Sequence, residues 1–463
     1  MDAKTEGLRQ DTLRRYARPA GRWKGLDWLT RAPPSRVWTA APGGSSLIPM
    51  LTNRRTFLAA GTAAAALGPL KLFAQEAAQT LRPMTGDVVP IAREEYQARI
   101  DKARRLMAAH NLGAVLIEPG ASLTYFTGVR WWRSERLTAV VIPRDGEAVI
   151  VTPHFEEPSV RESLKIPAEI RVWNEHEDPL ALVAGILRDR RVTAPVGIEE
   201  TVRFFAVDGL RRAMPGVEIR PANPVVRGCR MIKSPTELAL MQKASDITLA
   251  AYRHTYPRIE QGMTPAQIGA IMNGATSALG GNPEFALVLL GEASAYPHGS
   301  GQPQQVRGGE VVLMDCGCTV QGYQSDISRT FVFGTPTAEQ RRVWDQMHQG
   351  QALAFRTARL GTPCGAVDDA VRRLYERWGY GPGYRLPGLS HRTGHGIGMD
   401  GHEPVNLVHG EATPLAEGMC FSDEPGLYLP GKFGIRLEDC FYMTARGPRW
   451  FTTPPPSLDR PFD

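Results

Sequence analysis

The chain has 463 residues, 42% of them hydrophobic, so it is long enough to bury the cores of two or three domains. Its formal net charge of +6 comes from the N-terminus, where residues 1–49 hold nine Lys or Arg against four Asp or Glu, and residues 50–80 hold three against one. The remaining residues, 81–463, carry a net charge of −1. This nearly neutral body gives no support for a nucleic-acid partner, and we expect none.

Residues 50–78 are predicted to be a twin-arginine export signal. Arg54 and Arg55 precede a mildly apolar stretch rich in Ala and Gly, residues 57–70. Because this stretch is shorter than the roughly 20 residues of a membrane span, we expect no stable membrane anchor. The pattern indicates a periplasmic protein, with a flexible Ala-rich tail as the alternative. Cleavage is compatible with three positions, after Ala74, Ala77 or Ala78.

Residues 1–49 are rich in Arg, Pro and Trp, show no clear apolar period and end directly before Met50. We interpret them as a non-native or disordered extension and expect translation to start at Met50. N-terminal sequencing of the precursor that finds Met1 would contradict this.

Residues 88–225 are predicted to form a first domain of the α/β class. Residues 94–110 have helical spacing, with apolar side chains such as Ile100 and Met107 on one face. Short apolar runs punctuated by Gly and Pro predict strands at residues 114–119, 137–143 and 147–153.

Residues 234–450 are predicted to form a second domain of the α+β class. Ser234 at the N-cap, Pro235 at the first helical position and Glu237 at the third make a capping box that starts a helix. Thr264 and Thr337 begin two further helices in the same way, and a fourth helix ends at Gly379. Each pair of helices is associated with a hairpin, so the region predicts an internal pseudo-duplication.

Asp315 and Asp326 lie on two β-runs joined by the turn-prone pair Gln321-Gly322. If the hairpin turns about Val320-Gln321, the two carboxylates lie directly opposite each other. Opposed strand residues have Cβ atoms about 4.5–5.5 Å apart, where like charges are destabilising. The pairing is explained if a cation lies between them.

Glu424 and Glu438 repeat the arrangement downstream. The segment between them folds about Pro430-Gly431-Lys432, and each Glu is seven residues from Gly431. The pattern therefore predicts a second pair of opposed acids, one from each strand of a second hairpin. A purely structural role as solvated strand residues is the alternative for any one acid.

His395, in a Gly-rich segment between the two hairpins, adds a nitrogen ligand to these four carboxylates. Four carboxylates offer more oxygens than one ion normally needs, so we predict a centre of two divalent metal ions. The oxygen-rich set suits Mn best, and Co, Fe or Zn are possible.

The motifs HRTGHGIGMDGHEP, MDCG, SDISRTF, EPGLY and GIRLED resemble those of the M24 metallopeptidases, which include aminopeptidase P and prolidase. The resemblance covers residues 88–445. It implies a creatinase-like amino-terminal domain followed by a pita-bread catalytic domain, and a homodimer. It also implies that Asp315, Asp326, His395, Glu424 and Glu438 bind two metal ions, with Asp326 and Glu438 bridging.

The resemblance also assigns three pocket residues, and strand spacing adds Arg436 as a fourth candidate. His298 and His402 would line the substrate site and stabilise the tetrahedral intermediate, and His391 would shape the pocket for a proline ring. Arg436 would lie on the same strand face as Glu438 and orient it or a substrate carboxylate, with a structural ion pair as the alternative. Trp131 and Trp132 are weaker pocket candidates that could equally belong to the core.

The implied activity is exopeptidase hydrolysis of an Xaa–Pro bond by a metal-bridging hydroxide, with Glu424 as general base. The substrate would be a peptide with proline in the second position. The pattern separates neither a dipeptidase from an aminopeptidase nor one metal from another. A lyase or another hydrolase on the same scaffold, and a catalytically silent binding module, are the other classes.

Six cysteines remain: Cys229, Cys316, Cys318, Cys364, Cys420 and Cys440. Cys-x-Cys without a second nearby pair is a poor zinc signature, and an exported chain could form disulfides. We expect buried small hydrophobic residues rather than a redox role.

Overall fold

The computed structural model describes residues 81–462. The predicted N-terminal extension and export signal, residues 1–49 and 50–78, lie outside this range. Within it, no helix has the length and apolar character needed to cross a membrane.

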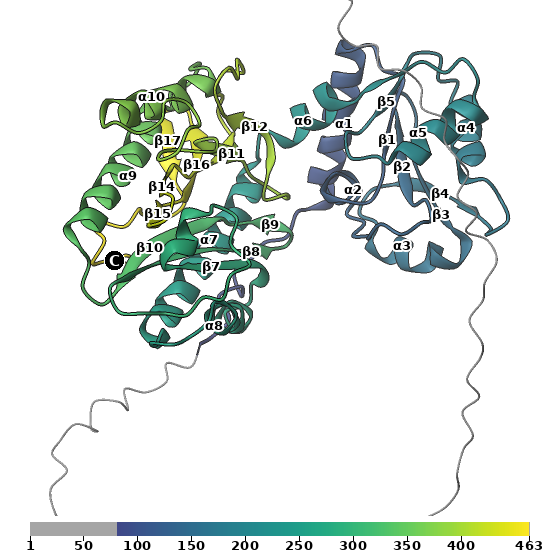
Figure 1. Cartoon of the computed structure of the whole chain (residues 1–463). Coiled ribbons are helices and arrows are strands. Elements are labelled where there is room, and N and C mark those ends of the chain that lie inside the picture. The colour runs from purple at the N-terminus through teal and green to yellow at the C-terminus, as the bar shows by residue number, and fades with distance from the viewer. Residues whose placement is uncertain (1–80, 463) are drawn as a thin grey trace, which may run out of the picture. The chain divides into compact units, whose positions relative to one another are not determined.

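The first part of the chain is built on a six-stranded mixed sheet (Figure 1). Its strand order is β4-β3-β2-β1-β5-β6, with β2 antiparallel to both of its neighbours and the other pairs parallel. The elements are α1 (Arg93–Ala109), β1 (Ala114–Ile117), α2 (Ala121–Thr127), β2 (Ala139–Pro143), β3 (Ala148–Pro153), α3 (Glu157–Ser163), β4 (Ala168–Trp173), α4 (Pro179–Asp189), β5 (Val196–Ile198), α5 (Phe204–Ala213), β6 (Ile219–Pro221) and α6 (Asn223–Arg230).

Both faces of this sheet are buried, which explains why β1, β2 and β3 read as continuous apolar runs. Residues of α1, α2 and α6 pack against one face, and residues of α4 and α5 pack against the other. The predicted helix over 94–110 and the three predicted strands are confirmed, and so is the α/β class of this part of the chain.

The second part of the chain contains two sheets and a separate hairpin. Its elements are α7 (Pro235–Thr255), α8 (Pro265–Ala278), β7 (Asn282–Leu290), β8 (Glu310–Val320), β9 (Tyr323–Gln324), β10 (Ile327–Phe333), α9 (Ala338–Thr357), α10 (Cys364–Arg377), β11 (Gly394–Gly396), β12 (Glu403–Leu407), β13 (Cys420–Asp423), β14 (Gly426–Leu429), β15 (Phe433–Arg436), β16 (Asp439–Thr444) and β17 (Gly447–Trp450).

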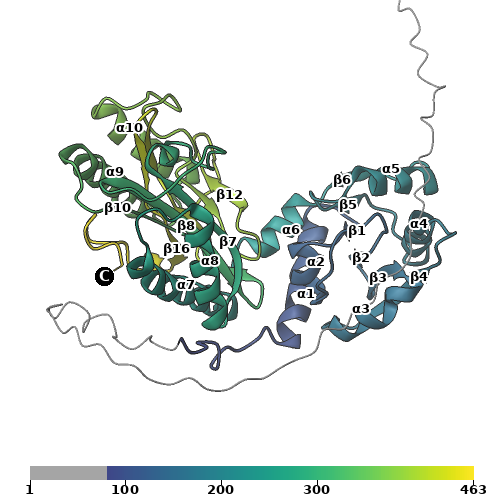
Figure 2. The ribbon, with the colours of Figure 1, turned by 60° about the horizontal axis from the view of Figure 1, so that its bottom comes forward.

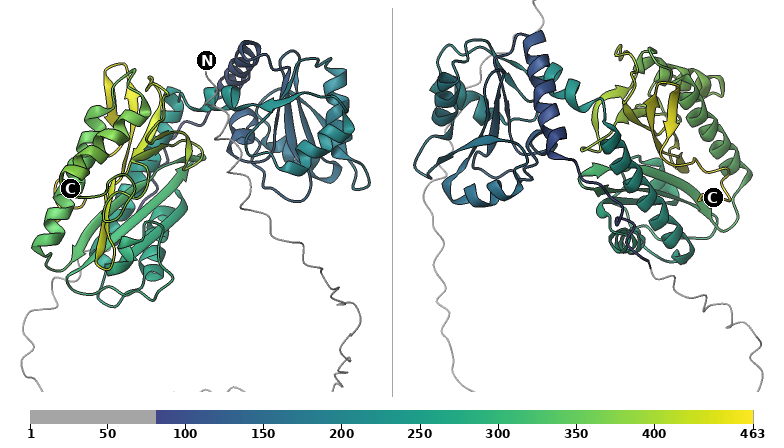
Figure 3. Two further views of the ribbon diagram at one scale, coloured as in Figure 1. Left: turned by 45° about the horizontal axis from the view of Figure 1, so that its top comes forward. Right: turned by 180° about the vertical axis from the view of Figure 1, so that it is seen from behind.

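Two helix pairs cover these sheets. Helices α7 and α8 pack against β7 and β8 of a sheet ordered β10-β8-β7 (Figure 2). Helices α9 and α10 lie beside strands of the sheet ordered β12-β11-β13-β16-β17 (Figure 3). The predicted recurrence of two helices and a hairpin is therefore present, with one acid-bearing hairpin in each half.

The three predicted capping boxes are confirmed at the starts of α7, α8 and α9. In α7, the Ser234 side chain accepts from the Glu237 backbone N–H, and the Glu237 side chain accepts from the Ser234 N–H. Satisfying these otherwise unpaired donors fixes where each helix begins.

All six cysteines are buried free thiols, as expected. Burial raises the pKa of Cys316, Cys420 and Cys440, which keeps these thiols protonated. They act as small apolar residues in the core beneath the acid-bearing strands.

Candidate metal centre

The first hairpin carries Asp315 on β8 and Asp326 just before β10, but in a different register from the predicted one. The turn is the two-residue pair Gln321-Gly322, with Val320 paired to Tyr323. Asp315 therefore lies opposite Ser328, and the same register places Asp326 opposite Gly317. The prediction that the two Asp are directly opposed is wrong, because the turn lies one residue further along the chain than assumed.

The second hairpin has the predicted register. Asp423 pairs with Asp439 on one side of the acids, and Gly426 pairs with Arg436 on the other. Both pairs are centred on Gly431, as are Glu424 and Glu438. These two glutamates lie where the ladder is interrupted, between β13–β16 and β14–β15.

The hairpins meet at His395 on β11. Ligand atoms of Asp326, His395 and Glu438 all lie within 4.8 Å of one another. His395 Nε2 is 3.6 Å from Asp326 Oδ2, 3.8 Å from Glu438 Oε1 and 3.4 Å from Glu424 Oε1. The structure thus brings together side chains spread over more than 100 residues of sequence, from Asp326 to Glu438.

The ring of His395 is oriented for metal binding. Its Nδ1 lies 3.1 Å from the carbonyl oxygen of Gly396, so Nδ1–H donates there and Nε2 keeps a free lone pair facing the carboxylates. Burial lowers the pKa of His395 well below its ordinary value, and this favours the neutral form that a metal requires. The His395 backbone N–H donates to Ser422 Oγ, which fixes the strand.

Unsatisfied oxygens test whether this site suits a cation. Asp315 Oδ1, Asp326 Oδ1 and Glu438 Oε1 are buried atoms without a hydrogen-bond partner among the described residues. Burial raises the pKa of Asp326 and of Glu438 well above ordinary values, and neighbouring carboxylates add to the rise. Buried, unpaired and mutually repelling carboxylates are costly unless positive charge compensates them, so the residues fit divalent metal ions.

Arg436, on β15 of the second hairpin, connects the two hairpins through hydrogen bonds to the first. Its Nη2 donates to Asp315 Oδ2 at 2.6 Å and its Nε donates to Ser328 Oγ at 2.9 Å. Ser328 Oγ in turn donates to Glu438 Oε2 at 2.7 Å. Arg436 therefore forms an ion pair with Asp315 and reaches Glu438 through Ser328.

His391 lies beside the centre in the segment that leads into β11. Its Nε2 is 2.7 Å from the Tyr428 hydroxyl, and its Nδ1 is 2.8 Å from the Arg392 carbonyl oxygen. Burial lowers the pKa of His391 to about 3, helped by the charge of Arg436, so the ring is neutral. Asp368 of α10 accepts from the backbone N–H and hydroxyl of Thr393, and this holds the segment in place.

His402 and His298 lie on exposed loops near the centre. The His402 ring centroid is 4.2 Å from that of His395. The pKa of His402 is lowered by partial desolvation of its ring, and the charges of Arg392 and His298 add to the fall. The loop carrying His402 is held by Glu403, whose Oε1 accepts from the backbone N–H of Met399 and of Asp400.

Sequence reasoning missed several residues that support the site. Ser328 is two positions after Asp326, which is a strand spacing that puts both on one face and could have revealed it. Tyr428 lies in the EPGLY motif. Arg392 lies three residues before His395, and its positive charge lowers the pKa values of His395, His402 and Glu424. Unlike Ser328, Tyr428 and Arg392 have no spacing signal that marks them as supports of the ligands.

Comparison with known proteins places the chain in a family. Residues 239–445 match metallopeptidase family M24, and residues 99–232 match the creatinase/prolidase N-terminal domain. The chain is 34% identical over 364 residues to the probable dipeptidase PepE of Mycobacterium tuberculosis, a match covering 76% of this chain and 93% of that protein. The chain belongs to metallopeptidase family M24.

A second relative and a solved structure support the same assignment. The chain is 30% identical to the Xaa-Pro dipeptidase of Lactobacillus helveticus, over 76% of this chain and 96% of that protein. The crystal structure of dipeptidase PepE from Mycobacterium ulcerans aligns with a TM-score of 0.74 at 31% identity, covering 80% of this chain and 99% of that one. The chain is thus a hydrolase of the metallopeptidase class, and the predicted creatinase-like and pita-bread folds are confirmed.

Proposed function

We propose that this M24 enzyme is an exopeptidase that hydrolyses Xaa–Pro bonds with two divalent metal ions. The observation that carries the proposal is the convergence of Asp326, His395 and Glu438 with unpaired, buried oxygens facing one another. The substrate class is supported by the Xaa-Pro dipeptidase among the chain's relatives.

Five side chains would hold the metal ions: Asp315, Asp326, His395, Glu424 and Glu438. Asp326 and Glu438 approach His395 from different hairpins, and the family resemblance implies that these two carboxylates would be shared between the ions. When bound, a pair of divalent ions supplies a water nucleophile active near neutral pH and a Lewis acid for the scissile carbonyl. Mn is our first choice, with Co, Fe or Zn as alternatives, because the oxygens outnumber the single nitrogen.

Glu424 is the residue we assign as general base. Its carboxylate lies 3.4 Å from His395 Nε2 at the proposed centre, and in the metal-free site burial raises its pKa to about 7. Bound metal ions would favour its ionised form, which is the form that a general base needs. It would accept a proton from the attacking water and return it to the prolyl nitrogen. Catalytic proton transfer of this kind typically contributes about 10²–10⁴-fold.

His298 and His402 are the groups we assign to the developing oxyanion. Both are on the exposed side of the centre and are free to meet a substrate. His391, held neutral beside Tyr428, would form an uncharged wall for the proline ring. Arg436 is committed to Asp315 and Ser328, so we assign it to positioning the ligands rather than to binding substrate.

A direct assay tests the proposal. The full chain is loaded with Mn and offered Ala-Pro and Ala-Pro-Ala. Cleavage of the dipeptide defines a dipeptidase, and cleavage of the tripeptide alone defines an aminopeptidase. Glu424→Gln should abolish either activity, whereas Asp345→Asn, an exposed acid on α9, should not change it. If neither peptide is cut while two metals are bound, the peptidase proposal fails in favour of a lyase or another hydrolase.

Export by the twin-arginine route to the periplasm, with the metal loaded before export, is part of the same proposal. The paired Arg54 and Arg55 support it. Replacing both by Lys should retain the protein in the cytoplasm, as measured by cell fractionation. Recovery of a metal-free protein that acquires metal only after export would contradict the order of loading. A homodimer is proposed as well, and light scattering would measure it.

A further inference from the structure

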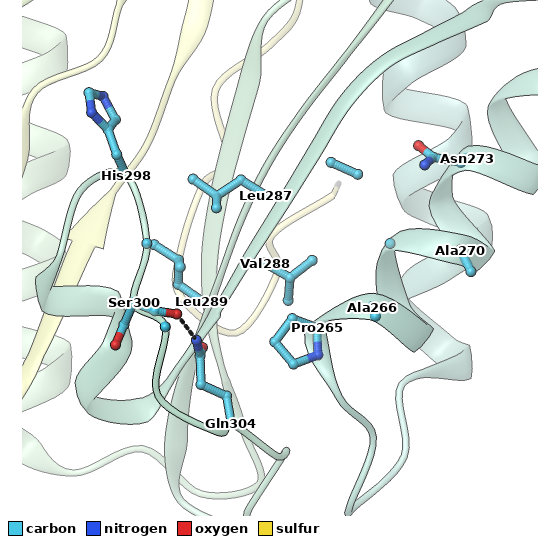
Figure 4. Close-up of a pocket in the computed structure, with 14 residues that line it drawn as sticks. Pro265, Ala266, Ala270, Asn273, Leu287, Val288, Leu289, His298, Ser300 and Gln304 are labelled. Atoms are coloured by element: carbon cyan, nitrogen blue, oxygen red, sulfur yellow. Dashed lines mark hydrogen bonds between the residues drawn. The ribbon is translucent and has the colours of Figure 1, made fainter. Parts of the chain in front are cut away.

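His298 and His402, the two groups assigned to the oxyanion, lie on separate loops. His298 lies at one end of a hollow of about 700 Å³ between α8 and β7, with its ring turned away from the other labelled side chains (Figure 4). The residue before it, Pro297, accepts from Arg436 Nη1 at 3.1 Å, which ties the His298 loop to the metal centre. The His402 side chain forms no hydrogen bond within residues 81–462, and its ring lies against that of His395. Its position is therefore set by the backbone of its loop.

The loop that carries His402, residues 398–403, closes on the side chain of Glu403. Glu403 Oε1 accepts from the backbone N–H of Met399 at 2.9 Å and from that of Asp400 at 3.2 Å. Glu403 is buried, whereas the neighbouring His402 is exposed. Because His402 lies between Asp400 and Glu403, the buried carboxylate holds the backbone on both sides of it.

Two cations from outside the loop hold the Glu403 carboxylate. Lys233, between α6 and α7, donates from Nζ to Glu403 Oε2 at 3.1 Å, and both side chains are buried. Arg230, the last residue of α6, donates from Nη2 to Glu403 Oε1 at 2.5 Å and to Asp400 Oδ2 at 2.7 Å. Burial raises the pKa of Glu403, but the charges of Lys233 and Arg230 outweigh it and lower this pKa to about 2.

Both cations are themselves fixed in place. The Lys233 backbone N–H donates to the carbonyl oxygen of Gly418 at 2.9 Å. Arg230 Nη1 donates to Ser122 Oγ at 2.9 Å. A buried carboxylate that loses a charged partner is costly, so removing either cation should loosen the hold of Glu403 on its loop.

The first hairpin holds the start of the same loop. The Gln324 backbone N–H donates to the carbonyl oxygen of Gly398 at 2.8 Å, and Gln324 Nε2 donates to that of Met399 at 3.4 Å. These contacts end three residues before His402. The part of the loop next to His402 therefore depends on Glu403 and its two cations.

We propose that Lys233 and Arg230 are positioning residues, which hold Glu403 and, through it, place His402 where the scissile carbonyl oxygen would lie. Neither cation meets the substrate in this role. A misplacement of about 1 Å, caused by a change far from the chemistry, can lower a rate by about 100-fold, so such residues can control kcat. The inference rests on the proposed exopeptidase function and adds two residues to it.

Kinetics of the Mn-loaded full chain test the positioning role. Lys233→Met removes one cation and keeps a side chain of similar length. We expect kcat for the peptide that the wild type cleaves to fall about 10–100-fold, with both Mn ions still bound as measured by mass spectrometry. Lys233→Arg keeps the charge and should lose less activity. Lys243→Met, which removes a lysine of α7 paired with Asp87, is the matched control and should keep the wild-type kcat.

A second substitution shows whether the effect passes through His402. In a His402→Ala background, Lys233→Met should change kcat by less than about twofold, because the group that Lys233 positions is already absent. Losses that multiply would overturn the inference, since Lys233 would then act independently of His402. Arg230→Gln, at a partly exposed site, is expected to behave in the same way and serves as the test if Lys233→Met does not fold.

Crystal structures of the variants separate this inference from the proposed function. The ring centroids of His395 and His402 are 4.2 Å apart, and in Lys233→Met they should separate by at least about 1 Å more. If they do, but the wild type cleaves no Xaa–Pro peptide, the proposed function fails and the positioning role stands. An unchanged separation in both Lys233→Met and Arg230→Gln would overturn the inference. Loss of bound Mn in these variants would also overturn it, because the two cations would then support the metal centre rather than His402.

Discussion

The two acid-bearing hairpins close with different turns, and this difference sets how their carboxylates meet. The β8–β10 hairpin turns at Gln321-Gly322, both with positive φ of 52° and 86°. The second hairpin turns over three residues centred on Gly431, which has a φ of 75°. In a two-residue turn, paired residues are equidistant from a point between the two turn residues. In a three-residue turn, they are equidistant from the middle turn residue.

The chemical consequence is a division of roles between the hairpins. In the first, Asp315 and Asp326 are offset, so Asp315 is free to pair with Arg436 while Asp326 faces His395. In the second, Glu424 and Glu438 share one register position and both face His395. Ser328 joins them, since its backbone pairs with that of Glu438 and its hydroxyl donates to the Glu438 carboxylate.

The largest expected effect is the loss of a ligand from either hairpin. Asp326→Asn and Glu438→Gln should each lower kcat by at least about 10²–10³-fold and reduce the bound metal, because both remove a charge placed to bridge. Activity assays and metal analysis by mass spectrometry measure this. Glu339→Gln, a half-exposed acid paired with Lys432, is the matched control. Full activity in either variant would show that its hairpin does not contribute to the centre.

Breaking the connection between the hairpins should have a smaller effect. Ser328→Ala removes the donor to Glu438 and the acceptor for Arg436, and we expect metal affinity to fall about 10–100-fold. A titration with a competing chelator measures the affinity, with Ser277→Ala on α8 as control. Unchanged affinity would mean that each hairpin holds its carboxylates without the other.

Without metal, the shared charge of the two hairpins should make stability depend on pH. The pKa values of Asp326 and Glu438 are raised, and that of Glu424 is about 7, so the folded state holds protons that the unfolded state has released. A carboxyl whose pKa is raised in the folded state makes its whole contribution to stability at pH values below its pKa in the unfolded chain. This contribution is lost as the pH rises through its pKa in the folded state. The metal-free enzyme should therefore be about 1–2 kcal/mol more stable at pH 6 than at pH 8.

Urea unfolding of metal-free and Mn-loaded protein at the two pH values measures this difference. In the Mn-loaded protein, the greater stability at pH 6 should disappear or be reversed, because bound cations stabilise the ionised carboxylates. A metal-free protein that is more stable at pH 8 would contradict the raised pKa values.

The smallest effect concerns the turns themselves. Gln321→Asn should stabilise the protein by about 0.5 kcal/mol, since Asn adopts positive φ more readily than Gln and Asn-Gly favours this two-residue turn. Lys432→Asn in the three-residue turn, where positive φ falls on Gly431, should bring no such gain. Thermal unfolding of both variants measures the difference, and equal shifts would contradict the distinction between the turns.

The same contrast shows what could be predicted from the sequence. The helix starts were recovered because a capping box is a local pattern, as at Ser234 and Glu237. The register of the second hairpin was predicted correctly because Gly431 marks the centre of its turn. The register of the first hairpin was missed because the symmetry point was expected between Val320 and Gln321. The Gly of the two-residue turn occupies its second position, so the symmetry point lies between Gln321 and Gly322.

The supporting contacts could not be predicted for a different reason. Ser328 and Arg436 are 108 residues apart and Arg436 and Asp315 are 121 apart, so no local spacing links them. Such features arise only when distant elements pack.

The bridge between Ser328 and Glu438 also constrains how the chain folds during its synthesis. It joins backbones 110 residues apart, and the second hairpin leaves the ribosome only after the first. A nascent chain that ends before β15 holds both Asp, His395 and Glu424 but lacks Glu438, so we expect it to bind metal weakly. Pairing over such long separations is slow because chain closure must precede the contacts that reward it. Metal capture should therefore coincide with the final closure of the chain.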